Sequence, residues 1–293
     1  MGRDRPMAGV CVVGSINLDL VARTARHPRP GETLLGFDYS EHAGGKGLNQ
    51  AVAAARSGAS TQLIAAVGED DAGMRLLGIA TAEGIDVDSV SSHAQSPTGR
   101  AVIVVDDNAE NSIVVVPGAN QFCPVLTEVT KTVVLAQLEV PVTSVLESFR
   151  AARRAGAITI LNPAPAAALP PELLELCDVI VPNEHEIDIL GGAEPLLAAG
   201  VSTIIVTLGS HGIDLIDAAG TRHIDAHDVE PVDTTGAGDA FCGCLAAGLA
   251  AGLTIDAASG RAIIAGALTT TRHGAVPSLP TQMEIDREIS RVA

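Results

Sequence analysis

Short apolar runs alternate with stretches of helical character along most of this 293-residue chain. Such alternation is typical of right-handed strand–helix–strand units, whose strands pair in parallel and whose helices cover both faces of the sheet. We therefore expect a three-layer α/β fold with a mainly parallel central sheet. The runs expected to form strands are 10–13, 62–67, 133–137, 158–161, 179–181 and 203–207.

Two regions interrupt this alternation. Residues 20–40 contain two prolines and then alternate polar with apolar side chains. Residues 101–105 and 112–116 are rich in β-branched side chains, and the polar segment between them favours a hairpin. On pattern alone, these pieces are equally compatible with decoration at the edge of the main sheet. We predict a small antiparallel sheet that projects from a single domain over 1–293, with a lid made of residues 20–42 and 98–117.

Composition restricts the partners of this chain. Hydrophobic residues make up 47% and aromatic residues only 2%, so the core must be built from small aliphatic side chains. The formal net charge is −17, which disfavours nucleic acid and anionic membranes as partners. An anionic ligand would then need local positive groups or backbone dipoles. No apolar run reaches 18 residues, so we expect no membrane span.

The cysteine pattern favours a reducing compartment. The chain has five cysteines, an odd number, and none of them form a Cys-x-x-Cys pair. Polar residues follow the first apolar run too soon for a signal peptide. We therefore expect a cytoplasmic protein, with Cys242 and Cys244 as small core residues.

Near the C-terminus, Gly236, Ala237 and Gly238 lead into a helix expected over 240–251. Two glycines at a helix start let unpaired backbone N–H groups converge at its positive end, which makes an anion site. Asp239 lies in the first turn, where a carboxylate is also an ordinary helix-start residue. Beside an anion site it is placed to accept the proton of an attacking hydroxyl during phosphoryl transfer. We favour this interpretation.

A second glycine-rich segment precedes the helix expected over 46–57. Upstream of it, Asn17 and Asp19 follow the first expected strand, and ligands of open parallel sheets bind at the carboxyl ends of strands. Two polar residues at positions i and i+2 of an extended segment face the same way, as neighbouring hydroxyls of a polyol require. Each of them alone is equally explained by an Asx turn. Neither a P-loop nor a Gly-x-Gly-x-x-Gly motif after a strand is present.

Several motifs together resemble the ribokinase family, also called PfkB-type sugar kinases. Residues 44–56, Gly-Gly-Lys-Gly-Leu-Asn-Gln-Ala-Val-Ala-Ala-Ala-Arg, resemble its first signature, and residues 233–239, Asp-Thr-Thr-Gly-Ala-Gly-Asp, resemble its second. Residues 183–186 are similar to its Asn-x-x-Glu motif. The resemblance runs from about Val10 to Pro280. The segments most similar to ribose-phosphorylating members are 14–19, 137–139, 162–166 and 271–278.

The resemblance implies ATP-dependent phosphorylation of a sugar's primary hydroxyl, and for these motifs the conversion of D-ribose to D-ribose 5-phosphate. Asp239 would be the base, and Gly236, Ala237 and Gly238 would form the anion hole. The residues implied to hold ribose are Asn17, Asp19, Gly45, Lys46, Gly47, Asn49, Glu139 and Asp239.

The resemblance also implies a nucleotide site and two kinds of ion. The turn over 207–212 is similar to the family's nucleotide-binding turn, although by pattern alone it is a simple link between two strands. Glu186 would act on Mg²⁺ through water. The nucleotide-binding residues implied are Asn183, Thr207, Gly209, Ser210, Gly212, Gly238 and Ile263. The K⁺ site implied comprises Asp233, Thr235, Thr269, Arg272, Gly274 and Ser278, mostly through backbone carbonyls.

Alternatives to this assignment remain. Another sugar or nucleoside kinase of the family, such as a deoxyribokinase or fructokinase, would carry the same signatures. A non-catalytic sugar-binding protein would not need the carboxylate of Asp239. Two segments, 121–133 and 182–203, are shorter than the family pattern. The resemblance further implies a homodimer joined through the lids.

Overall fold

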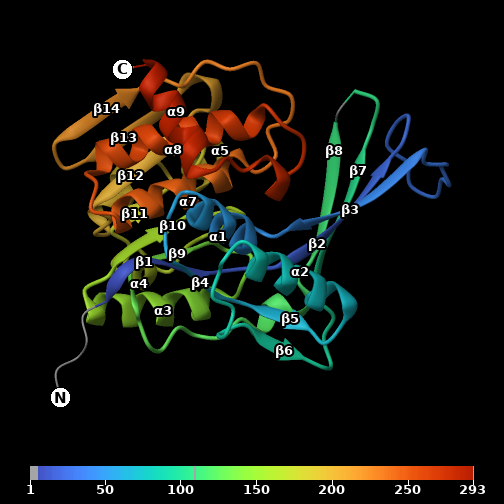
Figure 1. Ribbon diagram of the computed structural model, residues 1–293, viewed down its shortest axis with the longest axis horizontal. Helices are drawn as coiled ribbons and strands as arrows, with labels where there is room; N and C mark the ends of the chain where they lie inside the picture. The colour runs from blue at the N-terminus through green and yellow to red at the C-terminus, as the bar shows by residue number, and fades with distance from the viewer. Residues whose placement is uncertain (1–5, 109, 293) are drawn as a thin grey trace.

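The computed structural model describes residues 6–108 and 110–292. Its centre is an eight-stranded sheet in which six neighbouring strands are parallel and two strands at one edge are antiparallel (Figure 1). This arrangement confirms the expected mainly parallel sheet. From edge to edge the strands are β14 (Gly220–Ile224), β13 (Ile213–Asp217), β12 (Thr203–Thr207), β11 (Val179–Ile180), β10 (Ile158–Leu161), β9 (Lys131–Ala136), β1 (Met7–Val13) and β4 (Thr61–Ile64).

Helices cover both faces of this sheet. Along β1, Val10 and Val12 pack into one hydrophobic cluster, whereas Cys11 and Val13 pack into the other. A strand that is buried on both faces has a continuous run of apolar residues, as the sequence of β1 does. The first cluster includes side chains of α1 (Lys46–Arg56), α2 (Asp71–Ala82), α7 (Ala237–Ala250), α8 (Ile255–Thr270) and α9 (Gln282–Val292). The second includes side chains of α3 (Val142–Ala155), α4 (Pro171–Leu174), α5 (Glu184–Ile189) and α6 (Ala193–Ala198).

Small side chains let α1 and α7 pack closely. A Cβ atom at Gly243 would lie 2.5 Å from the carbonyl oxygen of Gln50 and 2.5 Å from the Cβ of Ala53. Only glycine fits there, because any side chain would push the two helices apart. The close contact brings the N-terminal parts of both helices, with Gln50 and Asp239, into one site.

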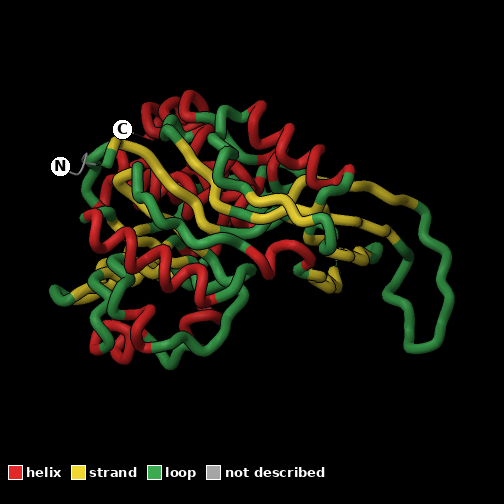
Figure 2. Tube along the Cα trace, turned by 90° about the horizontal axis from the view of Figure 1, so that it is seen from below, coloured by secondary structure: helices red, strands yellow, loops and turns green. Residues whose placement is uncertain are grey.

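A second sheet projects from the main body (Figures 1 and 2). The hairpin predicted from the sequence is present, as β7 (Gly99–Val105) and β8 (Asn111–Val116), and its turn includes Ala109, which lies outside the described residues. Next to it lie β2 (Asn17–Arg23) and β3 (Asp38–Gly44). The prediction of a purely antiparallel sheet is wrong, because β2 and β7 pair in parallel. The long chain segment between them allows this pairing.

The predicted strand over 62–67 is two strands. β4 ends at Ile64, and β5 (Ala66–Gly68) pairs instead with β6 (Ser91–His93) in a separate two-stranded sheet. Both pieces are buried, so the apolar run does not mark the change of partner. Of the two segments that looked short, 182–203 holds the small helices α5 and α6. The other has a single 3₁₀ turn, η1 (Gly118–Phe122), at its start.

None of the helices within residues 6–108 and 110–292 combines the length and the apolar character that crossing a bilayer requires.

Candidate active site

The N-terminus of α7 has the geometry of an anion site. Gly236 caps the helix with φ 81°, a left-handed conformation that favours glycine. The helix begins at Ala237, three residues before the position expected, so that Gly238 and Asp239 belong to its first turn. N–H groups of a first turn have no partner within the helix. At Gly238 an added Cβ would meet no atom within 4 Å, so the backbone there is open to a ligand.

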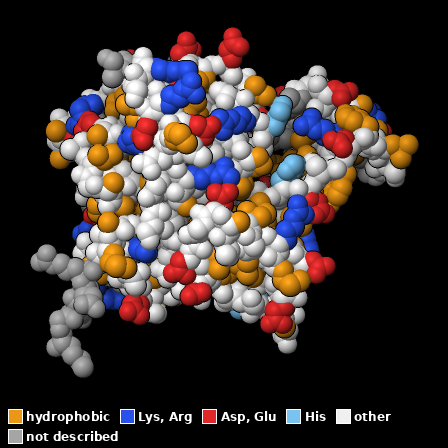
Figure 3. Space-filling model, in the orientation of Figure 1, with side chains coloured by type: hydrophobic (Ala, Val, Ile, Leu, Met, Phe, Trp, Pro, Cys, Tyr) orange, Lys and Arg blue, Asp and Glu red, His pale blue; other side chains and the backbone are white. Residues whose placement is uncertain are grey.

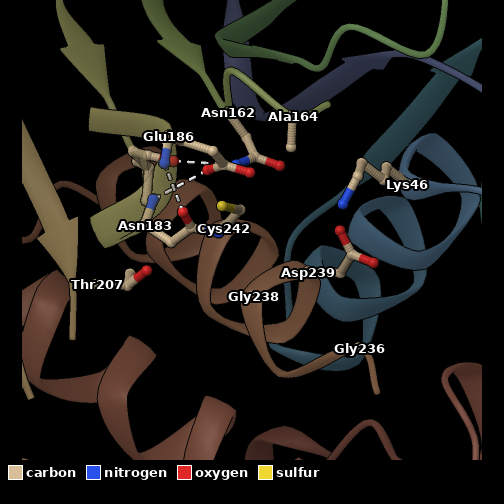
Figure 4. A pocket seen from close by; sticks show the side chains of 11 residues that line it. Lys46, Asn162, Ala164, Asn183, Glu186, Thr207, Gly236, Gly238, Asp239 and Cys242 are labelled. Atoms are coloured by element: carbon tan, nitrogen blue, oxygen red, sulfur yellow. Dashed lines mark hydrogen bonds between the residues drawn. The ribbon is translucent and has the colours of Figure 1, made fainter. Parts of the chain in front are cut away.

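A polar cavity of about 130 Å³ opens at this helix end. It lies where β10, β11 and β12 finish, which is the expected place for a ligand site in such a sheet. Figure 4 shows Lys46 and Asp239 pointing toward one another on one side of it, and Asn183 and Glu186 on the other. The described residues that line the cavity are Lys46, Asn162, Ala164, Val181, Asn183, Glu186, Thr207, Gly236, Gly238, Asp239 and Cys242.

The carboxylate of Asp239 is buried and held at both oxygens. Asn49 donates from Nδ2 to Oδ2 at 2.9 Å, and Gln50 donates from Nε2 to Oδ1 at 2.9 Å. Asp239 is only 8% exposed, yet it still lines the cavity. Asn49, implied to bind sugar, therefore also fixes the implied base. Gln50 lies in the first signature segment, but sequence reasoning assigned it no role.

The carboxylate of Glu139 is hydrogen-bonded both to the segment that follows β1 and to the first residue of α1. Its Oε2 accepts from Oγ of Ser15 at 2.5 Å, from the backbone N–H of Lys46 at 3.1 Å and from Nδ2 of Asn17 at 3.4 Å. Three donors, from two separate segments of the chain, thus meet at the carboxylate of Glu139. The structure brings together the implied sugar-binding residues Asn17, Lys46 and Glu139 in this way, and Ser15 is an addition.

Sequence reasoning also missed Asn120, which η1 carries into this region. Its Nδ2 donates to Oδ1 of Asn17 at 2.7 Å, and its Oδ1 accepts from the backbone N–H of Ile16 at 2.9 Å. Asn120 is 1% exposed. Because the oxygen of Asn17 is occupied by this bond, its amide nitrogen is directed toward Glu139.

The charges of the site are strongly coupled. Burial, followed by the charges of Glu139 and Asp239, raises the pKa of Asp19 to about 7. Burial alone would lower the pKa of Lys46, but three nearby carboxylates outweigh it and raise the pKa of this ammonium. Those carboxylates belong to Asp239, Glu139 and Glu186. One half-buried cation therefore faces several acids, an arrangement that suits a site for hydroxyls and phosphate.

Asn183 and Glu186 form a capping box at the start of α5. Oδ1 of Asn183 accepts from the N–H of Glu186 at 2.8 Å, and Oε2 of Glu186 accepts from the N–H of Asn183 at 2.9 Å. Both side chains also line the cavity. Among the described residues, no group of three or more His, Cys, Asp or Glu side chains could hold a metal ion. A lone carboxylate with hard oxygen atoms fits Mg²⁺ that keeps most of its waters.

The turn after β12 is a strand–turn–strand link, since β12 pairs antiparallel with β13 directly across it. Gly209 and Ser210 are exposed and Gly212 is buried, and these three are not among the cavity-lining residues described. Thr207 does line the cavity. Ile263 lies on α8, half-buried against the core, and is likewise outside the lining.

Asp233 ties two loops together beside the start of α7. Its Oδ1 accepts from the N–H of Thr235 and its Oδ2 from the N–H of Gly274, both at 2.9 Å. Burial alone would raise the pKa of this carboxyl, but these donors hold it below its ordinary value. The loops are therefore organised around a negative charge.

Three other residues of the implied K⁺ site, Thr269, Arg272 and Ser278, have occupied side chains. The hydroxyls of Thr269 and Ser278 donate to backbone carbonyls of their own turns, those of Ala265 and Ala275. Arg272 is exposed and paired with Glu284. Of these three residues, only the backbone carbonyls are left as ligands for a cation.

The chain belongs to the family of pfkB carbohydrate kinases, whose model matches residues 7–282. This membership confirms the resemblance and the three-layer fold expected from it.

Individual relatives are similar over nearly the whole chain. The chain is 38% identical to the ribokinase of Haemophilus influenzae over 292 residues, which cover 93% of this chain and 95% of that protein. It is 41% identical to the bifunctional ribokinase/ribose-5-phosphate isomerase A of Fructilactobacillus sanfranciscensis, covering 95% of this chain and 56% of that longer protein. The structure of Arabidopsis thaliana ribokinase complexed with ribose and ATP superposes with a TM-score of 0.89 at 30% identity, covering 96% of this chain and 98% of that one.

Proposed function

We propose that this chain catalyses the ATP-dependent phosphorylation of D-ribose at the 5-hydroxyl, giving D-ribose 5-phosphate and ADP. The observation that carries the proposal is the carboxylate of Asp239, held at both oxygens beside the open N-terminus of α7. The similarity to ribokinases over almost the full length supports ribose as the acceptor.

Ribose would lie between the projecting sheet and the start of α1. Residues paired across neighbouring strands point to the same face, and Asp19 pairs with Ala101 while Val21 pairs with Ile103. The carboxylate of Asp19, which would bind the sugar hydroxyls, therefore has apolar neighbours on the same face of the sheet, and these would cover the carbon atoms of the sugar. Asn17, Asn49 and Glu139, with the backbone of 45–47, would complete the polar contacts.

In the proposed reaction, Asp239 takes the proton of the 5-hydroxyl as that oxygen forms its bond to the γ-phosphorus of ATP. The bond from this phosphorus to the bridging oxygen breaks, and ADP leaves with the electron pair. The N–H groups of residues 236–238 and the charge of Lys46 stabilise the phosphoryl oxygens. A lid closing over the sugar would exclude water, which otherwise competes as acceptor.

Two ions would support this chemistry. Glu186 would hold Mg²⁺ through water, and Asn183 would lie near the phosphates; when bound, Mg²⁺ neutralises charge on the phosphate oxygens. The loops tied by Asp233 would hold K⁺ through backbone carbonyls. The turn over 207–212, with Thr207, Gly209, Ser210 and Gly212, would receive the nucleotide, and Ile263 would pack against its adenine ring.

A panel of acceptors tests the function. We expect ADP release with ribose to exceed that with 2-deoxyribose, fructose or a nucleoside by at least about tenfold in kcat/KM, because a site built to bond hydroxyls rejects acceptors that leave its polar groups unpaired. A higher efficiency with fructose or a nucleoside would assign the chain to another activity of the family.

Replacement of K⁺ by Na⁺ tests the monovalent site. We expect kcat with ribose to fall about tenfold, equivalent to about 1.4 kcal/mol of transition-state stabilisation, because the cation orders the loop before α7. Asp233→Asn should reduce the difference between the two buffers. Equal rates in K⁺ and Na⁺ for the unaltered protein would contradict this site.

We infer a homodimer joined through the projecting sheets. The outer strand β8 is exposed along its whole length, and Figure 3 shows hydrophobic side chains gathered toward the end of this sheet. An exposed apolar edge strand invites pairing with another chain. Light scattering should give twice the 29.7 kDa of one chain; a mass of one chain at working concentration would refute the dimer. The exposed apolar residues on the hairpin β7–β8 are Val102, Ile113, Val114, Val115 and Val116.

A cytoplasmic location is part of the proposal. All five cysteines are buried free thiols, and burial raises the pKa of Cys11 and Cys123 to about 12. Such thiols suit a reducing compartment. Cys242, expected in the core, is buried but also lines the cavity. Recovery of the protein in an envelope or secreted fraction would contradict this location.

A further inference from the structure

Three amide side chains from separate elements converge beneath Asp239. Gln50 lies on α1, Gln137 directly follows β9, and Asn162 directly follows β10. Gln50 and Gln137 are both 0% exposed. Burying polar groups this completely is costly unless each is hydrogen-bonded. Their partners therefore indicate what the cluster does.

Gln50 is the centre of the cluster. Its Nε2 donates to Oδ1 of Asp239 at 2.9 Å and to Oδ1 of Asn162 at 3.1 Å, while its Oε1 accepts from Nε2 of Gln137 at 2.5 Å. Asn162 in turn donates from Nδ2 to the carbonyl oxygen of Val181 at 2.9 Å. Every polar atom of Gln50 is thus engaged.

The direction of these bonds is fixed. If the amide of Gln50 were reversed, its oxygen would face the oxygens of Asp239 and Asn162, and its nitrogen would face the donor nitrogen of Gln137. Both contacts would be repulsive. Asp239 and Asn162, which both present oxygens, therefore fix the end of Gln50 that faces the carboxylate, and Gln137 supports this direction by donating to the oxygen of Gln50.

We propose that Gln50, held by Asn162 and Gln137, is a positioning residue that keeps the carboxylate of Asp239 in the plane required to accept the hydroxyl proton. This role of Gln50 rests on the proposed function of Asp239 as the base. A hydrogen bond donated to a carboxylate favours its charged form. With Asn49 on the other oxygen, the carboxylate cannot rotate, and its free lone pairs remain available toward the cavity it lines.

Gln50 acts in a site where several charged or titratable groups face Asp239. Lys46 favours the charged carboxylate, and the other acids oppose it. Because glutamine is neutral, replacing Gln50 by methionine leaves this set of charges unchanged. Any shift in pH dependence then reports the lost hydrogen bond. The groups that face Asp239 are Lys46 on α1, Asp19 on β2 and Cys242 on α7, and Lys46 in turn faces Glu139 after β9 and Glu186 on α5.

The test measures kcat, KM for ribose and the pH profile of kcat/KM for Gln50→Met and Gln137→Met. For Gln50→Met we expect kcat to fall about 10–100-fold, the usual effect of losing a bond to a charged acceptor, with KM changed less than about threefold. The acid limb of the profile should move to higher pH by about one unit. Gln137→Met should shift it in the same direction but less.

Gln62→Met is the matched control. Gln62 lies on β4, where its Nε2 donates to Oγ of Ser89 at 3.2 Å, and its replacement should leave the profile unchanged. A folded Gln50→Met variant with a normal acid limb would overturn the proposal, even if kcat fell, because packing loss alone does not move a titration. If Gln50→Met does not fold, a normal acid limb in Gln137→Met overturns it instead.

Failure of the ribokinase assignment would look different. If the unaltered protein prefers another sugar, the acid limb is measured with that sugar and the positioning role is tested as before. If Asp239→Asn turns over normally, the assignment of the base fails before the Gln50 variants are interpreted.

Discussion

Asp239→Asn should lower kcat with ribose by about 10³-fold while leaving ribose binding largely intact. General-base catalysis contributes about 10²–10⁴-fold, and an amide cannot accept the hydroxyl proton. Asn49 and Gln50 both donate to the carboxylate, so an amide at this position leaves one of these donors facing a donor. We therefore also expect a stability loss of about 1–3 kcal/mol from one unpaired buried group.

Two measurements separate the effects of this substitution. ADP release gives kcat, and calorimetric titration with ribose shows that the folded site persists. Asp256→Asn is the matched control, because Asp256 is also a carboxylate in the first turn of a helix, α8, but it is exposed and paired with Arg222. Near-normal turnover by Asp239→Asn would show that another group is the base.

The sequence predicted most of the central sheet, because its strands are local apolar runs. Residues 158–161 and 203–207 form strands with the predicted bounds. The change of partner after Ile64 was not predictable in this way, because burial on both sides of it leaves the apolar run unbroken. The parallel pairing of β2 with β7 likewise depends on how distant segments meet, which no local pattern encodes.

The same distinction between local and distant residues applies to the candidate site. Gly236 and Asp239 were predictable because their chemistry lies within a few consecutive residues at one helix start. Asn120 was not, because it reaches Asn17 across 103 positions of sequence. Gln50 stands inside a signature segment, but its role depends on Gln137 and Asn162, which arrive from two other strands. Local motifs thus indicated the reacting groups, whereas the residues that orient them required the tertiary structure.

Asp19→Asn should weaken ribose use and yet stabilise the ligand-free protein. The pKa of Asp19 is raised to about 7 by burial and by the charges of Glu139 and Asp239. In the unfolded chain it lies near the ordinary value of about 3.9. Between these two values the folded protein binds more protons than the unfolded one, so stability falls as pH rises from about 4 to about 7. An asparagine, which does not ionise, avoids this loss.

Thermal unfolding and kinetics together test this expectation. Relative to the unaltered protein, Asp19→Asn should gain much less in Tm at pH 4.5 than at pH 8, where the pKa difference of about three units corresponds to at most about 4 kcal/mol, or roughly 8–16 °C. KM for ribose should rise about 100-fold or more, since each hydrogen bond to a charged acceptor is worth about 1.5–3 kcal/mol. Asp88→Asn, at an exposed position, removes the same charge and should change neither quantity. A Tm difference that does not change with pH would contradict this expectation. It would mean that Asp19 is ionised over the whole pH range in the ligand-free protein, because the charge of Lys46 offsets that of the neighbouring acids.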